Sequence, residues 1–322
     1  MIRTAKSVFL IAMLMLPLQT ANADPWPTRL IKAIIPFSAG SATDVVPRLV
    51  LDRLSTELGQ PIVIENRAGA GGSLGTGLVA KAEPDGYTVL GHSSALTIAP
   101  AIFTDLPFDA ARDLASVLMI GSSANVMIVS MERPWRNVAD FIAAAKTPGA
   151  RITFGSVGVG TATHISAEKF RLAAGIDAAH APYRGGSEVI SDILGGRIDF
   201  YFCPLATALP LIREGQVRAL VVSTPQRVAE LPDVPSPPDA GLTNADSAIW
   251  FGLFMPAKTP RDVVKAMHAA GERVLADPRM QDSLRKLGVT TAPMTTADMD
   301  ALVVRDTAAN KAVVQAAGIK GN

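Results

Sequence analysis

The feature that most constrains the fold is a repeated unit in which a short apolar strand runs into a loop of small residues and then into a helix. Residues 30–36 form an apolar run that leads into the loop 37–44, and helical spacing of apolar residues follows. A glycine-rich loop at 66–73 and another small-residue loop at 156–161 stand in the same position between a strand and a helix. Strands that alternate with helices predict an α/β fold with a mostly parallel sheet covered by helices.

The three loops have a composition that favours anion binding. Each is expected at the carboxyl end of a strand and the amino end of a helix, where open α/β sheets bind ligands. The first N–H groups of a helix lack partners within the helix, and the helix dipole places partial positive charge there. Glycine allows close approach of a carboxylate or phosphate, and serine and threonine add hydroxyl donors. The alternative is that the glycines only turn the chain.

A signal peptide is predicted at the start of the chain. Arg3 and Lys6 precede an apolar run over 8–18, and Ala21-Asn22-Ala23 follows as a cleavage site. The run is too short to span a bilayer. We therefore expect a secreted protein that begins at Asp24 after cleavage behind Ala23, with an uncleaved anchor as the alternative, and we expect it in the periplasm.

Composition and motifs argue against several classes of function. The formal net charge of +1, without a basic run, disfavours nucleic acid as a partner. Four scattered histidines and one cysteine give no metal-ligand spacing, and no cofactor motif is complete, because a G-x-G-x-x-G pattern starting at Gly158 ends in Thr163. Cys203 is expected to be a buried small hydrophobe; whether it lines a pocket stays open.

A hydrolase remains a remote alternative. Gly91-His92-Ser93-Ser94-Ala95 is similar to the G-x-S-x-G nucleophile elbow, and it follows a predicted strand. Residues 95–100, however, do not have the pattern expected at the start of a helix. We expect no catalytic residue, and no turnover of esters or amides.

The chain resembles a known family over residues 26–320. It is similar to the periplasmic receptors of tripartite tricarboxylate transporters, the Bug (Bordetella uptake gene) proteins. The stretches that carry the resemblance are Trp26-Pro27, Ile34-Ile35-Pro36-Phe37, Thr43-Asp44, Val63-Ile64-Glu65-Asn66-Arg67-Ala68-Gly69-Ala70-Gly71-Gly72, Pro84-Asp85-Gly86-Tyr87-Thr88, Ala181-Pro182-Tyr183-Arg184-Gly185-Gly186, Gly195-Gly196-Arg197-Ile198-Asp199, Leu231-Pro232-Asp233-Val234-Pro235 and Trp250-Phe251-Gly252-Leu253.

The resemblance implies a two-lobed, flytrap-like periplasmic-binding-protein fold around a small organic acid. One lobe would comprise residues 24–123 with 248–322, and the other residues 124–247. Membrane transporter subunits would be the partners of a monomeric receptor, and a ligand-sensing adaptor for a membrane sensor is the alternative. The family's glycine pair in the first loop is Gly40-Ser41 here. The ligand-binding residues implied are Phe37, Ser38, Gly40, Ser41, Thr43, Asp44, Ser93, Ser94, Ser156, Gly158, Gly160, Thr161, His164 and Asp199.

Single side chains of this set have competing roles. Asp44 either caps or orients its loop, or contacts the amine of an amino-acid ligand. His164 either contacts an anion or packs its helix, and Asp199 is a structural or a ligand residue. The sequence does not identify the acid that is bound.

Overall fold

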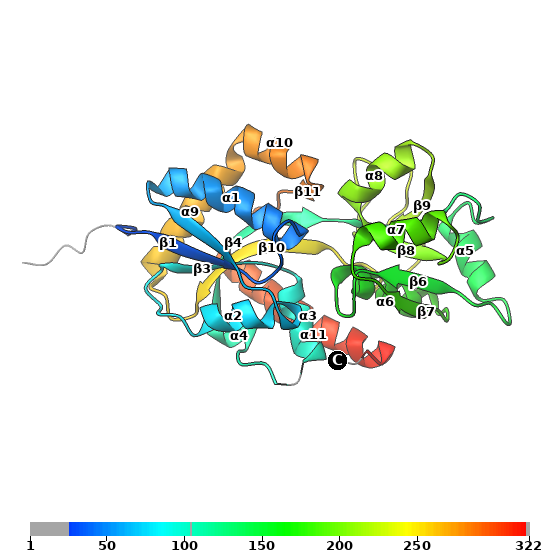
Figure 1. Ribbon diagram of the computed structural model, residues 1–322, viewed down its shortest axis with the longest axis horizontal. Helices are drawn as coiled ribbons and strands as arrows, with labels where there is room; N and C mark the ends of the chain where they lie inside the picture. The colour runs from blue at the N-terminus through cyan, green and yellow to red at the C-terminus, as the bar shows by residue number, and fades with distance from the viewer. Residues whose placement is uncertain (1–25, 104, 320–322) are drawn as a thin grey trace, which may run out of the picture.

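The computed structural model describes residues 26–103 and 105–319, and it shows two α/β lobes side by side (Figure 1). The predicted signal peptide lies outside the described residues. The first lobe contains a six-stranded sheet, and the second lobe a five-stranded sheet. The two-lobed α/β fold expected from the sequence is confirmed.

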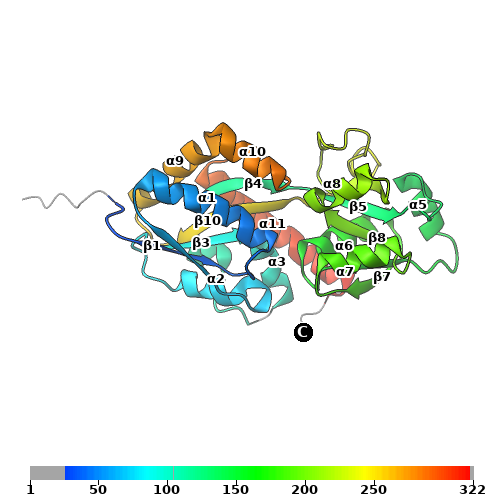
Figure 2. The same cartoon turned by 45° about the horizontal axis from the view of Figure 1, so that its top comes forward.

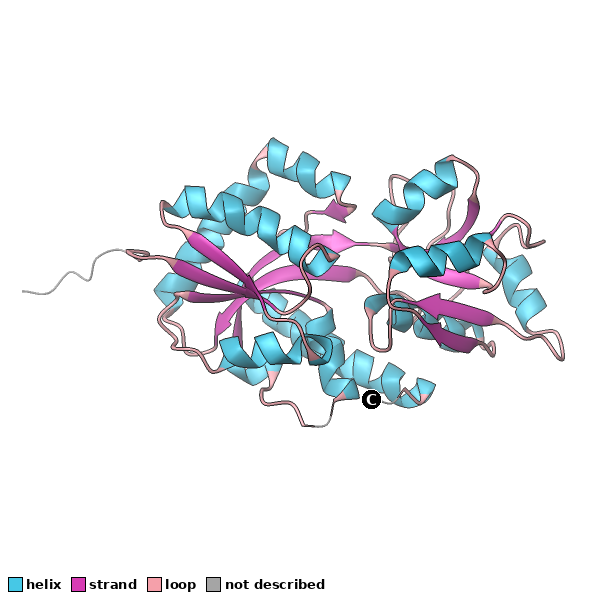
Figure 3. Cartoon of the chain, viewed as in Figure 1, coloured by secondary structure: helices cyan, strands magenta, loops and turns pink. Residues whose placement is uncertain are grey.

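The sheet of the first lobe, whose strands are magenta in Figure 3, takes strands from both ends of the chain (Figure 1). Its order is β11 (Val289–Thr290), β4 (Leu114–Ser123), β10 (Ile249–Pro256), β3 (Thr88–Ser93), β1 (Ile31–Ile35) and β2 (Ile62–Asn66). Strands β1, β2 and β3 are parallel, whereas β10 runs antiparallel to β3 and β4. The sheet is therefore mixed, because the strands that connect to the second lobe enter and leave along its carboxyl edge.

Helices cover both faces of this sheet. The helices of the first lobe are α1 (Ala42–Leu58), α2 (Ser73–Ala80), α3 (Ala95–Ile102), α4 (Ala110–Asp113), α9 (Arg261–Ala276), α10 (Pro278–Lys286) and α11 (Thr296–Ala317), with a short 3-10 turn at Ala70–Gly72. The apolar side chains of strand β10 pack against helices on both faces of the sheet. Phe251 and Leu253 pack under α1 and α9, and Trp250 and Phe254 pack against α11 on the other face. Side chains of a strand alternate between faces, so a nearly continuous apolar run indicates a strand buried on both sides.

The second lobe follows the same plan. Its sheet order is β7 (Ala179–Pro182), β6 (Thr153–Ser156), β8 (Phe200–Pro204), β5 (Asn125–Ser130) and β9 (Val217–Val222). Its helices are α5 (Val138–Ala145), α6 (Ala162–Ala174), α7 (Gly186–Leu194) and α8 (Leu205–Arg213). Met127 and Val129 of β5 face one core, and Val126 and Ile128 face the other. Cys203 is fully buried and unpaired, as expected, and burial raises the pKa of its thiol to about 12.

Two segments cross between the lobes. Strand β4 ends at Ser123 and β5 begins at Asn125, so a single residue, Ala124, separates them. The return segment joins β9 to β10 and includes the proline-rich stretch over 231–238, which forms turns. The two crossings are tied together, because the backbone N–H of Ser223 donates to the carbonyl oxygen of Asn125 at 2.8 Å.

Helices make a second connection between the lobes. Figures 1 and 2 show α11 extending from the first lobe to lie beside α6 of the second. Ile98 of α3, Ile165 of α6 and Val314 of α11 form a small buried cluster at this junction. The lobes therefore meet through packed side chains as well as through the crossing strands.

Candidate functional site

Two loops, one in each lobe, are built alike. The sequences Gly40-Ser41-Ala42-Thr43-Asp44 and Gly160-Thr161-Ala162-Thr163-His164 each join a strand of the sheet to the helix that follows it. Gly40 has a φ of 82° and Gly160 a φ of 75°, a region in which glycine is favoured. Each glycine N–H donates to the side chain four residues later, to Oδ2 of Asp44 at 2.8 Å and to Nδ1 of His164 at 3.1 Å.

The helix starts of the two loops also correspond. Ser41 and Thr161 are the N-caps, both with extended backbone, at ψ of 158° and 161°. Within the described residues neither side chain accepts a bond from the first N–H groups of its helix. The Oγ1 of Thr161 donates instead to the carbonyl oxygen of Gly158 at 2.7 Å, and the buried Oγ of Ser41 has no partner among the described residues. Each helix therefore presents free N–H donors to an anion.

Asp44 holds the first loop from inside. Its carboxylate is 2% exposed, and it accepts hydrogen bonds from Arg48 at 2.6 Å and from Nδ2 of Asn66 at 2.8 Å. Asn66 also donates to the carbonyl oxygen of Phe37. Burial would raise the pKa of Asp44, but the bonds from Arg48, Asn66 and the Gly40 N–H outweigh it and hold the pKa below its usual value. The carboxylate is fully engaged in orienting the loop.

The end of β3 lies beside the first loop. The hydroxyl of Thr43 donates to Oγ of Ser93 at 3.1 Å, and the ring of Phe37 meets His92 edge to face at 5.4 Å between centroids. His92 is 1% exposed, and burial lowers its pKa to about 4, with its backbone contact to Ser93 opposing the shift. Phe37, Thr43 and Ser93, three of the residues predicted to bind the ligand, thus lie around the end of β3 and the first loop. Ser38 lies in the same loop, and its carbonyl oxygen accepts the N–H of Ser41.

One expectation about this segment is wrong. Residues 95–100 do begin a helix, α3, which spans Ala95–Ile102 with Ser94 as its N-cap. Pro100 lacks an N–H, so one intrahelical bond is missing, but the N–H of Phe103 still donates to the carbonyl oxygen of Ala99. The strand, turn and helix of a nucleophile elbow are present, yet the hydroxyl partner of Ser93 is Thr43 and not a histidine.

The second loop rests on two histidines. The Oγ of Ser156 lies 2.6 Å from Nε2 of His180 and accepts the N–H of Gly158 at 3.1 Å. His164 and His180 are stacked face to face, with centroids 3.8 Å apart. Nε2 of His164 is 3.6 Å from the buried carboxylate of Glu168, and Arg171 donates to the other oxygen of that carboxylate at 2.7 Å. His164 therefore orients the second loop as Asp44 orients the first.

The structure does not bring Asp199 to these loops. It precedes β8, next to Thr153 at the start of β6, whereas Ser156 is at the carboxyl end of β6. Its carboxylate pairs with Arg133 at 2.7 Å and accepts the N–H of Thr153 at 2.8 Å. This geometry gives Asp199 a structural role at the amino ends of β6 and β8, opposite the end of the strands that carries the loop.

The loop of the second lobe contacts the first lobe. A Cβ placed on Gly160 would lie 2.2 Å from Cδ1 of Ile102 at the end of α3. The close approach adds a second reason for glycine here, besides its backbone angle. Gly40 has open space at the same point, with no atom of the described residues within 4 Å of such a Cβ.

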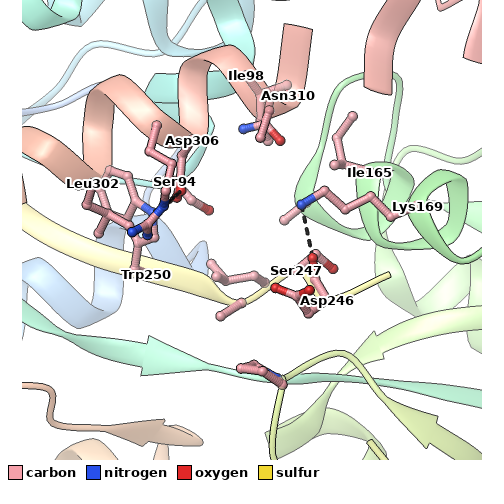
Figure 4. A pocket seen from close by; sticks show the side chains of 16 residues that line it. Ser94, Ile98, Ile165, Lys169, Asp246, Ser247, Trp250, Leu302, Asp306 and Asn310 are labelled. Carbon is pink, nitrogen blue, oxygen red and sulfur yellow. Dashed lines mark hydrogen bonds and ion pairs between the residues drawn. The ribbon is translucent and has the colours of Figure 1, made fainter. Parts of the chain in front are cut away.

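A hollow of about 240 Å³ lies at the lobe junction and was not anticipated from the sequence. Figure 4 shows Ser94, Trp250 and Asp306 on one side of it and Lys169 on the other. Lys169 donates to the carbonyl oxygen of Asp246 at 3.0 Å, and Trp250 donates to Asp306 at 2.9 Å. Burial lowers the pKa of Lys169, although Asp246 and Asp306 oppose the shift. Ser94 alone of the predicted ligand residues lines this hollow.

Two α/β lobes that are joined by crossing strands, each with a small-residue loop before a helix start, define the class of periplasmic solute-binding proteins. Residues 46–319 match the model of the tripartite tricarboxylate transporter family receptor. The chain belongs to this family of receptors, in agreement with the resemblance noted from its sequence.

Three relatives show how close the likeness is. The chain is 30% identical to BugT of Bordetella pertussis over 84% of this chain and 83% of the relative. Rpa4515 of R. palustris, solved with adipate, matches with a TM-score of 0.79 at 29% identity and covers 92% of this chain and 100% of its own. MatC of Rhodopseudomonas palustris, solved with malate, matches with a TM-score of 0.76 at 28% identity and covers 90% and 100%.

A helix must be both long and apolar to cross a bilayer. None within 26–103 and 105–319 is both long enough and apolar enough to cross a membrane.

Proposed function

We propose that this protein is an extracytoplasmic receptor that binds a small organic carboxylate between its lobes and delivers it to a membrane transporter of the tripartite tricarboxylate type. The observation that carries the proposal is the pair of matched loops, each with unused helix N–H groups and a positive-φ glycine. A carboxylate has two oxygens that such donors can share. Relatives solved with adipate and malate support this ligand class.

We assign the ligand contacts to the loops. In the first lobe the contacts would come from Phe37, Ser38, Gly40, Ser41 and Thr43, with Ser93 and Ser94 beside them. In the second lobe they would come from Ser156, Gly158, Gly160 and Thr161. Asp44 and His164 shape the loops from within, because their polar atoms are already bonded to Gly40 and Gly160. Asp199 is left out of the set because it lies at the opposite end of the strands from the loop.

The remaining features follow from this receptor role. We infer a monomer secreted by a signal peptide cleaved after Ala23, with lobes at 24–123 plus 248–322 and at 124–247. We infer no catalytic activity: the described contacts of the Ser93 hydroxyl are to Thr43 and to the N–H of Ala95, neither of which is a general base.

A ligand screen tests the proposal. Mature protein is heated with malate, adipate, other mono-, di- and tricarboxylates, sugars and divalent cations. A carboxylate at about 100 times its Kd stabilises the fold by about 2.7 kcal/mol and raises the melting temperature. If sugars or cations raise it and no carboxylate does, the proposed ligand class is wrong.

Substitutions at the helix starts test which donors bind. Ala42→Pro and Ala162→Pro each remove one free N–H at the first helical position, where proline is well tolerated. The extended backbone of Ser41 and Thr161 suits a following proline. We expect about tenfold weaker carboxylate binding by calorimetry with unchanged stability. Thr296→Pro at the start of α11 is the matched control and leaves affinity unchanged.

A further inference from the structure

The lobes have a second close contact, at Gly288 between α10 and β11. Gly288 has a φ of 69°, and a Cβ placed on it would lie 2.9 Å from Cβ and 3.1 Å from the backbone N of Ala206. Ala206 belongs to the first turn of α8 in the second lobe. Carbon atoms that are not bonded to each other prefer a separation of about 3.5–4.0 Å, so a side chain on Gly288 would push against the start of α8. Glycine is therefore favoured here by the contact as well as by the backbone angle.

This contact lies beside the first crossing between the lobes. The residue that follows Gly288 begins β11, which pairs with the end of β4 at Ser123. Leu205, the residue that precedes Ala206, donates its N–H to the carbonyl oxygen of Ala124 at 2.9 Å. The two lobes therefore touch right next to the residue that joins them.

The two loops that we assign to ligand binding lie several strands away from this crossing. In the first sheet β1 is the third strand from β4, and in the second sheet β6 is the second strand from β5. Neighbouring strands are about 4.8 Å apart, so the loops are on the order of 10–15 Å from the crossing. A small change in the angle between the lobes at the crossing is therefore expected to change the separation of the loops.

Two hollows adjoin the contact between the lobes. Figures 1 and 2 show α8 of the second lobe opposite α10 of the first. The hollows have volumes of about 490 and 320 Å³, and both are lined by Glu230 of the second lobe and Arg285 of the first. These long side chains can change rotamer, whereas Gly288 meets the backbone and Cβ of Ala206. The contact at Gly288 is therefore the rigid part of this side of the junction.

The contact on the α11 side of the junction is softer. There a Cβ on Gly160 would meet Cδ1 of Ile102, the far end of a side chain that can turn away. At Gly288 the opposing atoms belong to a helix that is fixed to Ala124 by a hydrogen bond. The separation of the lobes is therefore determined more firmly at Gly288 than at Gly160.

We propose that Gly288 and Ala206 form a stop that sets the angle between the lobes, and that this angle holds the loops at 40–44 and 156–161 where one carboxylate ligand can contact both. The consequence for binding rests on the proposed function, in which the ligand lies between the lobes. Gly288 and Ala206 are positioning residues, because they act on the ligand only through the separation of the loops. A larger side chain at either position changes the lobe angle and weakens binding.

Distances between the lobes of the ligand-free protein test the stop by itself. Nitroxide labels are attached at Asp52→Cys on α1 and Ala139→Cys on α5, both exposed positions, while the buried Cys203 stays unlabelled. Pulsed electron paramagnetic resonance measures the distance between the labels. We expect the mean distance to change by about 1 Å or more in Gly288→Ala, because the new Cβ has to move from 2.9 Å to an ordinary contact distance.

Three further variants separate the contact from backbone strain. Gly215→Ala is the matched control, because Gly215 has a φ of 68° and no atom of the described residues within 4 Å of such a Cβ. It should leave the lobe distance unchanged. Ala206→Gly/Gly288→Ala removes the opposing Cβ and should restore the distance. Ala206→Val enlarges the stop from a helical position and leaves the glycine in place, so it should change the distance without strain at positive φ.

Calorimetry with malate tests the consequence for binding. We expect about tenfold weaker binding in Gly288→Ala, because binding then has to bring the lobes back together against the clash. Gly215→Ala should bind malate as the unmodified protein does. Ala206→Gly/Gly288→Ala is expected to bind within about twofold of the unmodified protein, since the two substitutions compensate each other.

Three results overturn the proposal. One is a lobe distance in Gly288→Ala and Ala206→Val that equals that of the unmodified protein. Another is an affinity in Gly288→Ala that Ala206→Gly does not restore. The third is undiminished malate affinity in a variant whose lobe distance has changed. If the distances change and are restored as expected but neither malate nor any other carboxylate binds the unmodified protein, the stop stands and the proposed ligand class is wrong.

Discussion

The two loops that we assign to ligand binding have similar backbone angles at the glycine and the N-cap, but different side chains hold them in place. In the first lobe a charged network fixes the loop, since Asp44 binds Arg48, Asn66 and the Gly40 N–H. In the second lobe the equivalent side chain is His164, whose ring is stacked on His180. We therefore expect the two loops to differ in how pH and substitutions change the stability of the protein. They should also differ at the loop glycine, because only Gly160 lies against a side chain of the other lobe.

The largest effect is expected at Asp44. Asp44→Ala leaves the Gly40 N–H and Asn66 without their acceptor and Arg48 without its partner. We expect a loss of about 3 kcal/mol in the free energy of unfolding, measured in urea, because removing one member of a buried pair leaves the other uncompensated. Asp44→Asn retains an oxygen acceptor and is expected to lose less. Equal losses would show that the hydrogen bonds contribute little beyond the charge.

Acid is expected to destabilise the fold through its buried histidines. The pKa of His92 is about 4 in the fold, against 6.5 ordinarily, and that of His180 is also about 4, chiefly because of burial and then of the adjacent His164. Between pH 6.5 and 4 the unfolded chain binds protons that the folded chain does not, so stability falls as pH falls. His92 contributes on the order of 3 kcal/mol over this range.

Urea unfolding at intervals from pH 7.5 to 4 measures this loss. In His92→Gln the unfolding free energy should fall less between pH 7.5 and 4, because the contribution of His92 is removed. His180→Gln should reduce the fall by a smaller amount, because His180 is less buried. A curve for His92→Gln as steep as that of the unmodified protein would contradict the low pKa. Asp44 does not confuse the comparison, because its pKa lies below its usual value and outside this window.

Removing the ring of His164 is expected to cost less than removing Asp44. His164→Ala deletes a buried ring and the acceptor of the Gly160 N–H, so we expect a loss of about 2 kcal/mol in unfolding free energy. His164→Gln, which keeps an acceptor, should recover part of it. If His164→Ala lowers the unfolding free energy more than Asp44→Ala does, the expectation that Asp44 contributes more to stability is wrong.

The smallest difference concerns the loop glycines. Gly40→Ala and Gly160→Ala both place a Cβ at positive φ, which costs about 1 kcal/mol. Gly160→Ala must also displace the side-chain end of Ile102, so its cost should rise to about 2 kcal/mol. Thermal unfolding of the two variants gives the difference. In Gly160→Ala/Ile102→Ala the clash with Ile102 is gone, so adding the glycine substitution to Ile102→Ala should cost no more than Gly40→Ala does.

Local patterns predicted much of the architecture. The strand, small-residue loop and helix units at 30–58 and 152–174 were visible because apolar periodicity and glycine position depend on nearby residues. Helix α3 was missed because Pro100 disfavours a helix in isolation, whereas packing of Leu96 and Ile98 in the cores stabilises it. Tertiary contacts can override a propensity that operates on a single turn.

The site was predicted less completely than the fold. The loops were found, but the location of Asp199 depends on strand order, which no local pattern specifies. The correspondence of Gly40 to Asp44 with Gly160 to His164 is readable in the printed sequence, where G-S-A-T-D and G-T-A-T-H occur once each. The hollow around Lys169 joins segments far apart in the chain, so its existence follows only from the packed structure.

The connection through Ala124 limits how the molecule can move. Ser123 on one side is fixed in a sheet opposite Ile249, and Asn125 on the other side is bonded to Ser223. Each residue has only two soft backbone torsions, so a connection of one residue has very few rotatable bonds. At this connection one lobe can therefore turn relative to the other only through the few torsions around Ala124, and a single residue leaves little room for one lobe to slide past the other.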